Sequence, residues 1–255
     1  MSAGIDIPEG KRLNKYGDLE NIEMTVEDWM TRWEKKHIGF HAKEIHKILQ
    51  KYLDTILNGR KEIRIFIPLC GKSLDIKWLA EQGHTVVGVE VSKIAIKEFF
   101  AEQNLSYTQG SVPGIPGAEV FTSSDGCISL FNCNMFDFSS AIAGKFDGIW
   151  DRGSLVAINP SDKKRYVELI VNLMAKGCNY LLDTFTYDED KYVGPPFSVP
   201  ELVIEDLYGQ SCNIQLIQSS DALTDKQRLW GLDSFTEHIY LITLKTDTDS
   251  CALMH

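Results

Sequence analysis

The stretch that decides the fold is Ile63-Arg-Ile-Phe-Ile-Pro-Leu-Cys-Gly-Lys-Ser73, continued after a helical segment by His84-Thr-Val-Val-Gly-Val-Glu90. Its first part is a short, β-branched apolar run that stops at Pro68 and is typical of a buried strand. Ser73 can cap the helix that follows, which we expect to end near Gly83. A second buried strand then delivers Glu90 at its end. An acid about 20 residues after such a turn is the arrangement that holds an adenosine ribose.

The turn between these elements contains one glycine, Gly71, and not the three of a dinucleotide-binding turn. A turn that cradles a pyrophosphate needs several glycines so that the backbone can approach the phosphates. The sequence therefore argues against NAD and favours a ligand that has adenine and ribose but no phosphate. S-adenosylmethionine is such a ligand, and its sulfonium is attracted to aromatic faces.

Further strands and helices alternate along the chain, which predicts an α/β fold with a parallel sheet covered on both faces. We expect a helix over 92–103, a loop over 109–126 that contains a short strand at 119–122, and strands over 127–134, 146–150 and 179–186. The last two predicted strands, 213–218 and 237–244, are separated by about 18 residues. This is too short for a full crossover helix, so they should pair antiparallel.

The chain divides into a polar segment over 1–23, one domain over 24–245 and a tail over 246–255. The first segment lacks periodicity, so we expect it to be disordered or loosely docked, and the tail to be flexible. Residues 24–58 are expected to form a helical lid or cap, which Thr25 and Asp28 begin with a capping box.

Trp29 and Trp33 lie four residues apart and so share one face of the helix that follows Asp28. They either pack on the core or, with Phe40, line an aromatic lid over a flat ligand. His37, His41 and His46 come next, before or within a helix predicted over 41–58. Their spacings of four and five residues do not bring a third metal ligand together with two others, so we interpret them as a solvated helix face and expect no metal site.

Composition excludes several classes of function. The 255 residues carry a net charge of −10, which argues against a nucleic-acid or anionic-membrane partner. The six cysteines include no pair with the two-residue spacing of a zinc or redox motif, which predicts reduced, buried thiols. No signal peptide and no membrane helix are predicted, and no exposed apolar stripe demands a partner. We therefore expect a cytoplasmic monomer.

Ligands of open α/β sheets bind at the carboxyl ends of the strands. The residues expected there are 69–72, Glu90, 134–137 and 150–153. Glu90 is either the ribose acid or a surface carboxylate. Asn134 and Met135 are candidates to flank an adenine ring, and Asp137 is either a polar contact or a cap.

Long blocks of the chain resemble the thiopurine S-methyltransferase family, from about Met24 to Lys245. The blocks are Phe66-Ile-Pro-Leu-Cys-Gly-Lys-Ser73, Gly83-His-Thr-Val-Val-Gly-Val-Glu90, Phe99-Phe-Ala-Glu-Gln-Asn-Leu-Ser-Tyr107, Gly144-Lys-Phe-Asp-Gly-Ile-Trp-Asp-Arg-Gly-Ser-Leu-Val-Ala-Ile-Asn-Pro160, Gly194-Pro-Pro-Phe197 and Val199-Pro200. The resemblance implies a Rossmann-like sheet of seven strands, mostly parallel with an antiparallel last strand, helices on both faces and an N-terminal helical cap.

The resemblance also implies the site. It places an aromatic lid at Trp29, Trp33 and Phe40, and S-adenosylmethionine contacts at Leu69, Gly71, Glu90, Asn134, Met135 and Arg152. It places a small-molecule thiol, such as a thiopurine, at Phe40 and Arg152. Lys226 stands where the family often has an arginine, and a lysine lacks the planar fork needed for a bidentate contact.

The implied activity is methyl transfer from S-adenosylmethionine to an aromatic or heterocyclic thiol. Arg152 is then the catalytic candidate, because its charge favours the ionised thiol, although an ion pair with Asp151 or Asp147 is an alternative role. Two other functions stay open. One is methylation of another soft nucleophile, such as an inorganic selenium or sulfur species, and the other is a nicotinamide-dependent oxidoreductase or a non-catalytic nucleotide-binding domain.

Overall fold

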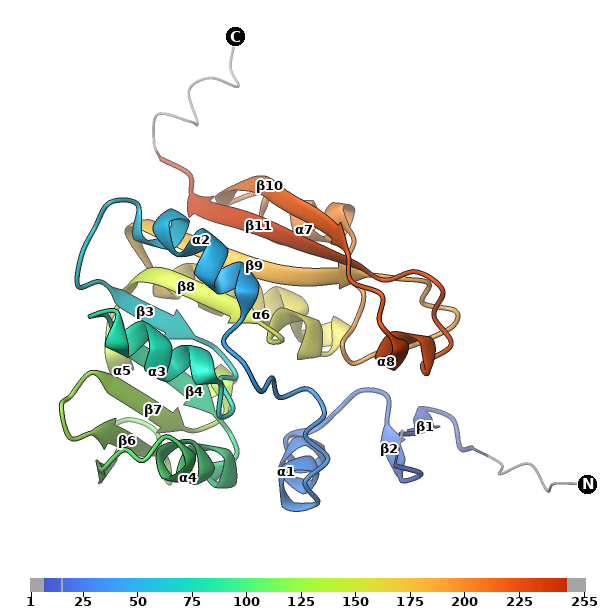
Figure 1. Cartoon of the computed structure of the whole chain (residues 1–255), viewed down its shortest axis with the longest axis horizontal. Coiled ribbons are helices and arrows are strands. Elements are labelled where there is room, and N and C mark those ends of the chain that lie inside the picture. The colour runs from blue at the N-terminus through green and yellow to red at the C-terminus, as the bar shows by residue number, and fades with distance from the viewer. Residues whose placement is uncertain (1–6, 15, 247–255) are drawn as a thin grey trace, which may run out of the picture.

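A nine-stranded mixed sheet forms the centre of the molecule in the computed structural model, which describes residues 7–14 and 16–246 (Figure 1). The sheet order is β10-β11-β9-β8-β3-β4-β7-β6-β5. The strands of this sheet are β3 (Arg64–Ile67), β4 (Thr85–Glu90), β5 (Tyr107–Ser111), β6 (Glu119–Ser123), β7 (Ile128–Asn132), β8 (Phe146–Arg152), β9 (Met174–Thr186), β10 (Cys212–Asp221) and β11 (Thr236–Leu244). The helices are α1 (Val26–Glu34), α2 (Lys47–Leu57), α3 (Leu74–Glu81), α4 (Lys93–Glu102), α5 (Ser140–Ala143), α6 (Lys163–Leu173), α7 (Glu201–Tyr208) and α8 (Asp225–Arg228).

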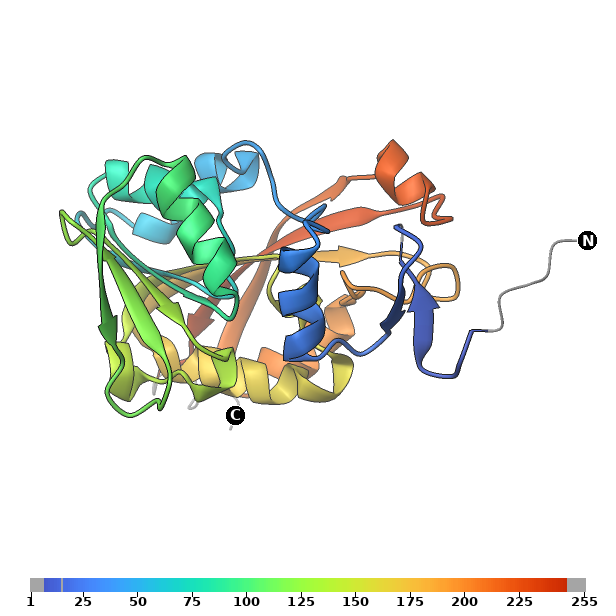
Figure 2. The same ribbon diagram turned by 90° about the horizontal axis from the view of Figure 1, so that it is seen from below.

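Helices cover both faces of the sheet, as predicted. Figure 2 shows α2, α3 and α4 on one side of the sheet and α6 and α7 on the other. Each layer has its own apolar core. Leu49, Ile76 and Phe99 pack under the first group of helices, and Tyr166, Ile170 and Ile204 pack under the second.

The sheet has more strands, and more antiparallel pairs, than the resemblance implied. Four strand pairs are parallel and four are antiparallel, so "mostly parallel" and the count of seven strands were wrong. The antiparallel pairing of the last two strands is confirmed. The unpredicted strand is β5, which was expected to be loop from residue 109 onward. Every side chain of β5 is exposed, so its sequence has no apolar alternation that would indicate a strand.

Local capping signals were read correctly from the sequence. Thr25 and Asp28 form the capping box of α1. Ser73 accepts a hydrogen bond from the Asp75 backbone N–H at 3.2 Å, and Ser92 caps α4 through the Ala95 N–H. Gly83 has a φ of +89°, the left-handed conformation that follows many helices.

The helix predicted over 41–58 begins only at Lys47. His46 has an extended backbone, and its N–H donates to Asp75 Oδ1 at 2.9 Å, a side chain on α3. This long-range bond stops the helix from continuing toward residue 41. The expectation that His37, His41 and His46 form a solvated helix face was therefore wrong, because none of them lies within a helix.

The N-terminal segment contains a hairpin where no regular structure was expected. Strands β1 (Lys11–Leu13) and β2 (Leu19–Asn21) pair antiparallel. Glu20 of β2 accepts from Arg12 of β1 at 2.8 Å, which joins the two strands. Glu20 also accepts from Arg32 at 2.6 Å, which holds the hairpin to α1. Such polar pairing has no apolar periodicity, which explains why the sequence did not indicate it. Residues 1–6 and 15, and the tail from 247 onward, lie outside the described residues.

The described cysteines are unpaired thiols, four of them buried, as predicted. Cys251 lies outside the described part of the chain. Within that part, every helix is too short or too polar to cross a membrane.

Candidate functional site

A cavity of about 370 Å³ opens at the carboxyl ends of β3, β4 and β8. The turn after β3 and the end of β4 form one wall. Helix α1 and residues 40–42 form a second wall, and we keep the name lid segment for these and the residues that join them. The opposite wall is formed by Pro195 and Pro196 together with the segment between β10 and β11. The cavity thus lies where the parallel strands predict a ligand.

The turn after β3 is conformationally unusual. Leu69 has a φ of +41° and Gly71 a φ of +53°. A positive φ is strained for leucine, and such residues gather at ligand-binding turns. Space at Gly71 is also tight, because a Cβ there would lie 3.2 Å from Trp33 Cζ2. The glycine therefore allows the lid to approach the turn.

Glu90 is buried at the end of β4, with 6% of its surface exposed. Oε2 accepts from the Gly71 N–H at 2.9 Å and Oε1 accepts from the Ser92 N–H at 2.7 Å. Burial raises the pKa of Glu90 to about 7, although these backbone donors pull it down. Each carboxylate oxygen keeps a further lone pair for a ligand hydroxyl on the cavity side.

Three aromatic side chains form the lid wall. The rings of Trp29 and Trp33 meet Phe40 edge-on, with centroids 5.8 Å and 5.6 Å apart. Trp33 is 3% exposed and also lines the cavity. The two interpretations of the tryptophans are therefore compatible, because Trp33 packs as a buried residue and still lies on the cavity wall.

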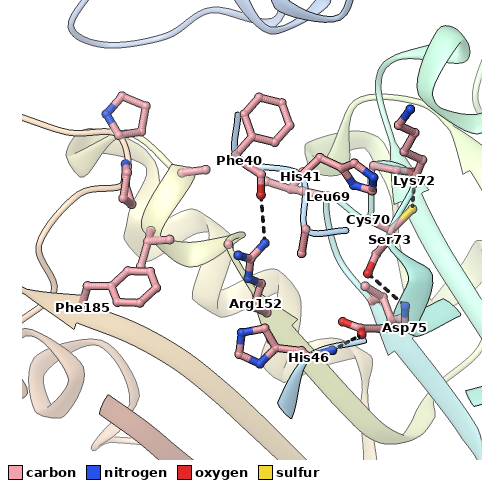
Figure 3. A pocket seen from close by; sticks show the side chains of 18 of the residues that line it. Phe40, His41, His46, Leu69, Cys70, Lys72, Ser73, Asp75, Arg152 and Phe185 are labelled. Atoms are coloured by element: carbon pink, nitrogen blue, oxygen red, sulfur yellow. Dashed lines mark hydrogen bonds between the residues drawn. The ribbon is translucent and has the colours of Figure 1, made fainter. Parts of the chain in front are cut away.

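Arg152 at the end of β8 and Lys226 on the opposite wall both donate hydrogen bonds to the lid segment. Arg152 Nη1 donates to the Phe40 carbonyl at 3.1 Å (Figure 3), and Lys226 Nζ donates to the Gly39 carbonyl at 2.9 Å. Among the described residues Arg152 forms no ion pair with Asp151 or Asp147. Asp147 lies 3.9 Å from Arg60 instead, and Asp151 lies on the other face of β8, where Tyr166 and Tyr180 donate to it.

Two predicted cofactor residues do not line the cavity. Asn134 Oδ1 accepts from the Phe136 N–H at 3.0 Å, and Met135 is buried in the core at 3% exposure. Asp137 is exposed within the same short turn of helix. The structure thus brings together Trp29, Trp33, Phe40, Leu69, Gly71, Glu90, Arg152 and Lys226 around the cavity.

The floor of the cavity includes polar residues that sequence reasoning missed. Asp75 accepts from the His46 backbone N–H and from Trp150 Nε1, both at 2.9 Å. His46, Asp75 and Glu237 all line the cavity, beside Trp150, which lies in the stretch 150–153 expected there. In the sequence Asp75 looks like an ordinary acid in the first turn of a helix, and nothing local indicates that distant segments converge on it.

Solved structures of similar shape include several methyltransferases. The chain is 15% identical to the 1,6-didemethyltoxoflavin-N1-methyltransferase of Burkholderia thailandensis, solved with S-adenosylhomocysteine bound, with a TM-score of 0.57 over 87% of each chain. It is 12% identical to the N-methyltransferase NodS of Bradyrhizobium japonicum, with a TM-score of 0.57 over 83% of this chain and 97% of the other. The fold is therefore that of the S-adenosylmethionine-dependent methyltransferases.

Sequence comparison then gives the family. The model of the thiopurine S-methyltransferase family matches residues 24–245. The chain is 53% identical to a probable thiopurine S-methyltransferase of Danio rerio, over 88% of this chain and 96% of the relative. It is 50% identical to the thiopurine S-methyltransferase of Rattus norvegicus, over 91% and 98%. The chain belongs to the thiopurine S-methyltransferase family, which confirms the resemblance seen in the sequence.

Proposed function

We propose that the chain is an S-adenosylmethionine-dependent S-methyltransferase that acts on aromatic and heterocyclic thiols, thiopurines among them. The observation that carries this proposal is one cavity lined by two chemically different groups of residues. Glu90 and the single-glycine turn form the first group, and Arg152, which donates to the Phe40 carbonyl, forms the second. The relatives named thiopurine S-methyltransferase support the same reaction.

Glu90 and the turn at Gly71, the first group, fit the methyl donor. The buried carboxylate of Glu90 suits the two ribose hydroxyls, and the turn has one glycine, Gly71, where a pyrophosphate-binding turn has several. Trp29, Trp33 and Phe40 present aromatic surface for a flat base and a sulfonium. Contacts from Asn134 and Met135 to the adenine stay a prediction.

Arg152, the second group, suits the acceptor. S-adenosylmethionine, when bound, supplies an electrophilic methyl group on a positively charged sulfur. Glu90 and the turn at Gly71 would hold this donor and Arg152 would hold the ionised sulfur of the acceptor, so that the methyl group would pass to that sulfur as its bond to the sulfonium breaks, leaving a thioether and S-adenosylhomocysteine. Arg152 lowers the pKa of the bound thiol by its charge, so that no dedicated base is required. The lid excludes water and aligns the reactants, an effect that can supply up to about 7–11 kcal/mol.

Two measurements test the proposal. Calorimetry with S-adenosylhomocysteine and with NADH should show binding of the first only, and the purified protein should convert 6-mercaptopurine to its S-methyl product when S-adenosylmethionine is supplied. Binding of NADH alone would overturn the proposal in favour of an oxidoreductase. Methylation of selenite or sulfide with no turnover of aromatic thiols would instead assign the acceptor to the inorganic class.

We also propose that the protein acts as a monomer. Sedimentation at assay concentration should show a monomer, and the specific activity should not depend on protein concentration. A cytoplasmic location is part of the same proposal and is tested by fractionation of the source cells.

A further inference from the structure

A second polar cluster lies beneath the cavity, at the carboxyl end of β9. Strand register places its members on one face of the sheet. Arg152 lies opposite Asp183 on β8 and β9, and Glu237 of β11 lies opposite Phe185, two residues beyond Asp183. Residues paired across strands, and those two apart along a strand, point to the same side of a sheet. Asp183 and Glu237 therefore project together toward the face that α2 covers.

His46 completes this cluster from a different part of the chain. Its ring lies beside Trp150, with centroids 5.4 Å apart, and its backbone N–H is fixed by Asp75. His46 Nε2 lies 3.9 Å from Asp183 Oδ2. One nitrogen of His46 and one carboxylate oxygen each of Asp183 and Glu237 all lie within 4.8 Å of one another.

Asp183 receives no hydrogen bond within the described part of the chain that would explain its burial, although Arg152 lies opposite it in strand register. Asp183 is fully buried, and neither of its oxygens receives a hydrogen bond from any described residue. The Nδ1 atom of His46 is buried without a partner as well. Arg152, the cation nearest in register, donates to the Phe40 carbonyl. A buried carboxylate without a donor is costly, so this position requires either a proton or a cation.

We propose that His46, Asp183 and Glu237 form a binding site for one divalent cation of the borderline class, such as Co²⁺ or Zn²⁺. One imidazole and two carboxylates are a ligand set that these ions accept. Two carboxylates neutralise the charge of the ion.

The dimensions of the cluster allow this occupant. Nitrogen and oxygen ligands lie about 2.0–2.2 Å from Zn²⁺, so two ligand atoms of one ion are roughly 3–4 Å apart. The ligand atoms lie within 4.8 Å of one another, so binding of one ion would require them to approach by up to about an ångström. His46 and Glu237 line the cavity, so the remaining coordination positions face it. This site does not depend on the proposed methyl transfer.

The test is a titration of the full chain with Co²⁺ after treatment with a chelator. We expect one equivalent to bind, with visible absorption typical of nitrogen and oxygen ligands and without a thiolate charge-transfer band. That band would instead assign the ion to the free cysteines. Because an ion that binds only the folded state stabilises it, Zn²⁺ should also raise the melting temperature.

Matched variants locate the ion. Asp183→Asn and Glu237→Gln should each weaken Co²⁺ binding by about tenfold or more. Asp206→Asn, an equivalent change at an exposed position of α7, should leave it unchanged. If Asp183→Asn fails to fold, Glu237→Gln decides, because Glu237 is only half-buried. The proposal is overturned if the wild type binds neither Co²⁺ nor Zn²⁺, or if the two cluster variants bind Co²⁺ as well as Asp206→Asn does.

Discussion

At the scale of single residues, Glu90 is the side chain whose position tells most about the ligand. It lies at the end of a buried strand, and two backbone N–H groups fix both of its oxygens. We expect Glu90→Ala to weaken S-adenosylhomocysteine binding by about 100-fold or more, because hydrogen bonds to a charged group contribute about 1.5–3 kcal/mol each. Calorimetry measures this directly. An unchanged dissociation constant in a folded variant would remove Glu90 from the ribose-binding role.

The ionisation of Glu90 adds a pH dependence. Burial raises the pKa of this carboxyl from its ordinary 4.5 to about 7 in the folded chain. Between these values the folded chain holds a proton that the unfolded chain has released. Stability should therefore fall as pH rises from about 4.5 to about 7 and level off above, and Glu90→Gln should lack this component. Since the carboxylate is the better acceptor for ribose hydroxyls, cofactor affinity should fall as pH drops below about 7. A slope of stability with pH that is the same in Glu90→Gln and wild type would contradict this assignment.

Arg152 carries the second residue-scale prediction. Its charge favours the ionised form of a bound thiol, so Arg152→Ala should lower kcat/KM for 6-mercaptopurine by about 10–100-fold near neutral pH. The loss should shrink at higher pH, where the acceptor is ionised without help. Arg152→Lys keeps the charge and should keep most of the activity at neutral pH. A loss in Arg152→Ala that does not vary with pH would exclude the electrostatic role and leave the Phe40 contact as its cause.

At the scale of elements, the lid is held from both of its ends. At its start, the Met24 N–H donates to the Asn159 amide oxygen, and the Asn159 amide donates to the Met24 carbonyl, both at 2.9 Å. At its end, Arg152 and Lys226 bind the carbonyls of residues 40 and 39. The lid is therefore anchored to the sheet by hydrogen bonds far apart in the sequence, which local sequence patterns do not reveal.

We expect Asn159→Ala to loosen the start of α1. It should weaken cofactor binding and change the melting temperature only slightly. The reason is that α1 contributes to the cavity wall while only Trp33 of this helix is buried. Tryptophan quenching provides the measurement.

Trp29 is the half-exposed indole of the lid, so Trp29→Phe should remove most of the quenching by S-adenosylhomocysteine, whereas Trp33 is already covered. Equal quenching in Trp29→Phe and wild type would count against a ligand-contacting lid.

The elements also show what a sequence can predict. The caps at Thr25, Ser73 and Ser92 depend on side chains close in sequence to the groups they bind, and all three were correct. The hairpin at the N-terminus and the start of α2 depend on charged or polar partners elsewhere, and both were missed. Glu90 and Gly71 could be predicted because strand and turn chemistry place them. The cluster of His46, Asp183 and Glu237 could not, because three distant segments form it.

At the scale of the whole molecule, Asp151 joins the layers. Its carboxyl accepts from Tyr166 of α6 at 2.6 Å, from Tyr180 of β9 at 2.8 Å and from the Leu155 N–H at 3.1 Å. Tyr180 in turn lies 2.9 Å from the Tyr208 hydroxyl of α7. Alternation along β8 thus sends Asp151 into the core and the next residue, Arg152, to the cavity. Two adjacent charged residues therefore have separate roles, one in stability and one in the site.

This separation can be tested by comparing unfolding with ligand binding. Asp151→Ala should lower the free energy of unfolding by roughly 3–5 kcal/mol, because it leaves buried tyrosine hydroxyls and a backbone N–H without an acceptor. Asp151→Asn keeps one carbonyl oxygen as an acceptor and should lose less. In the folded fraction of either variant, affinity for S-adenosylhomocysteine should stay close to wild type, since Asp151 does not line the cavity. Urea unfolding and calorimetry measure the two quantities separately. A large loss of affinity with an unchanged unfolding midpoint would show that Asp151 acts on the site after all, and that the faces of β8 are coupled.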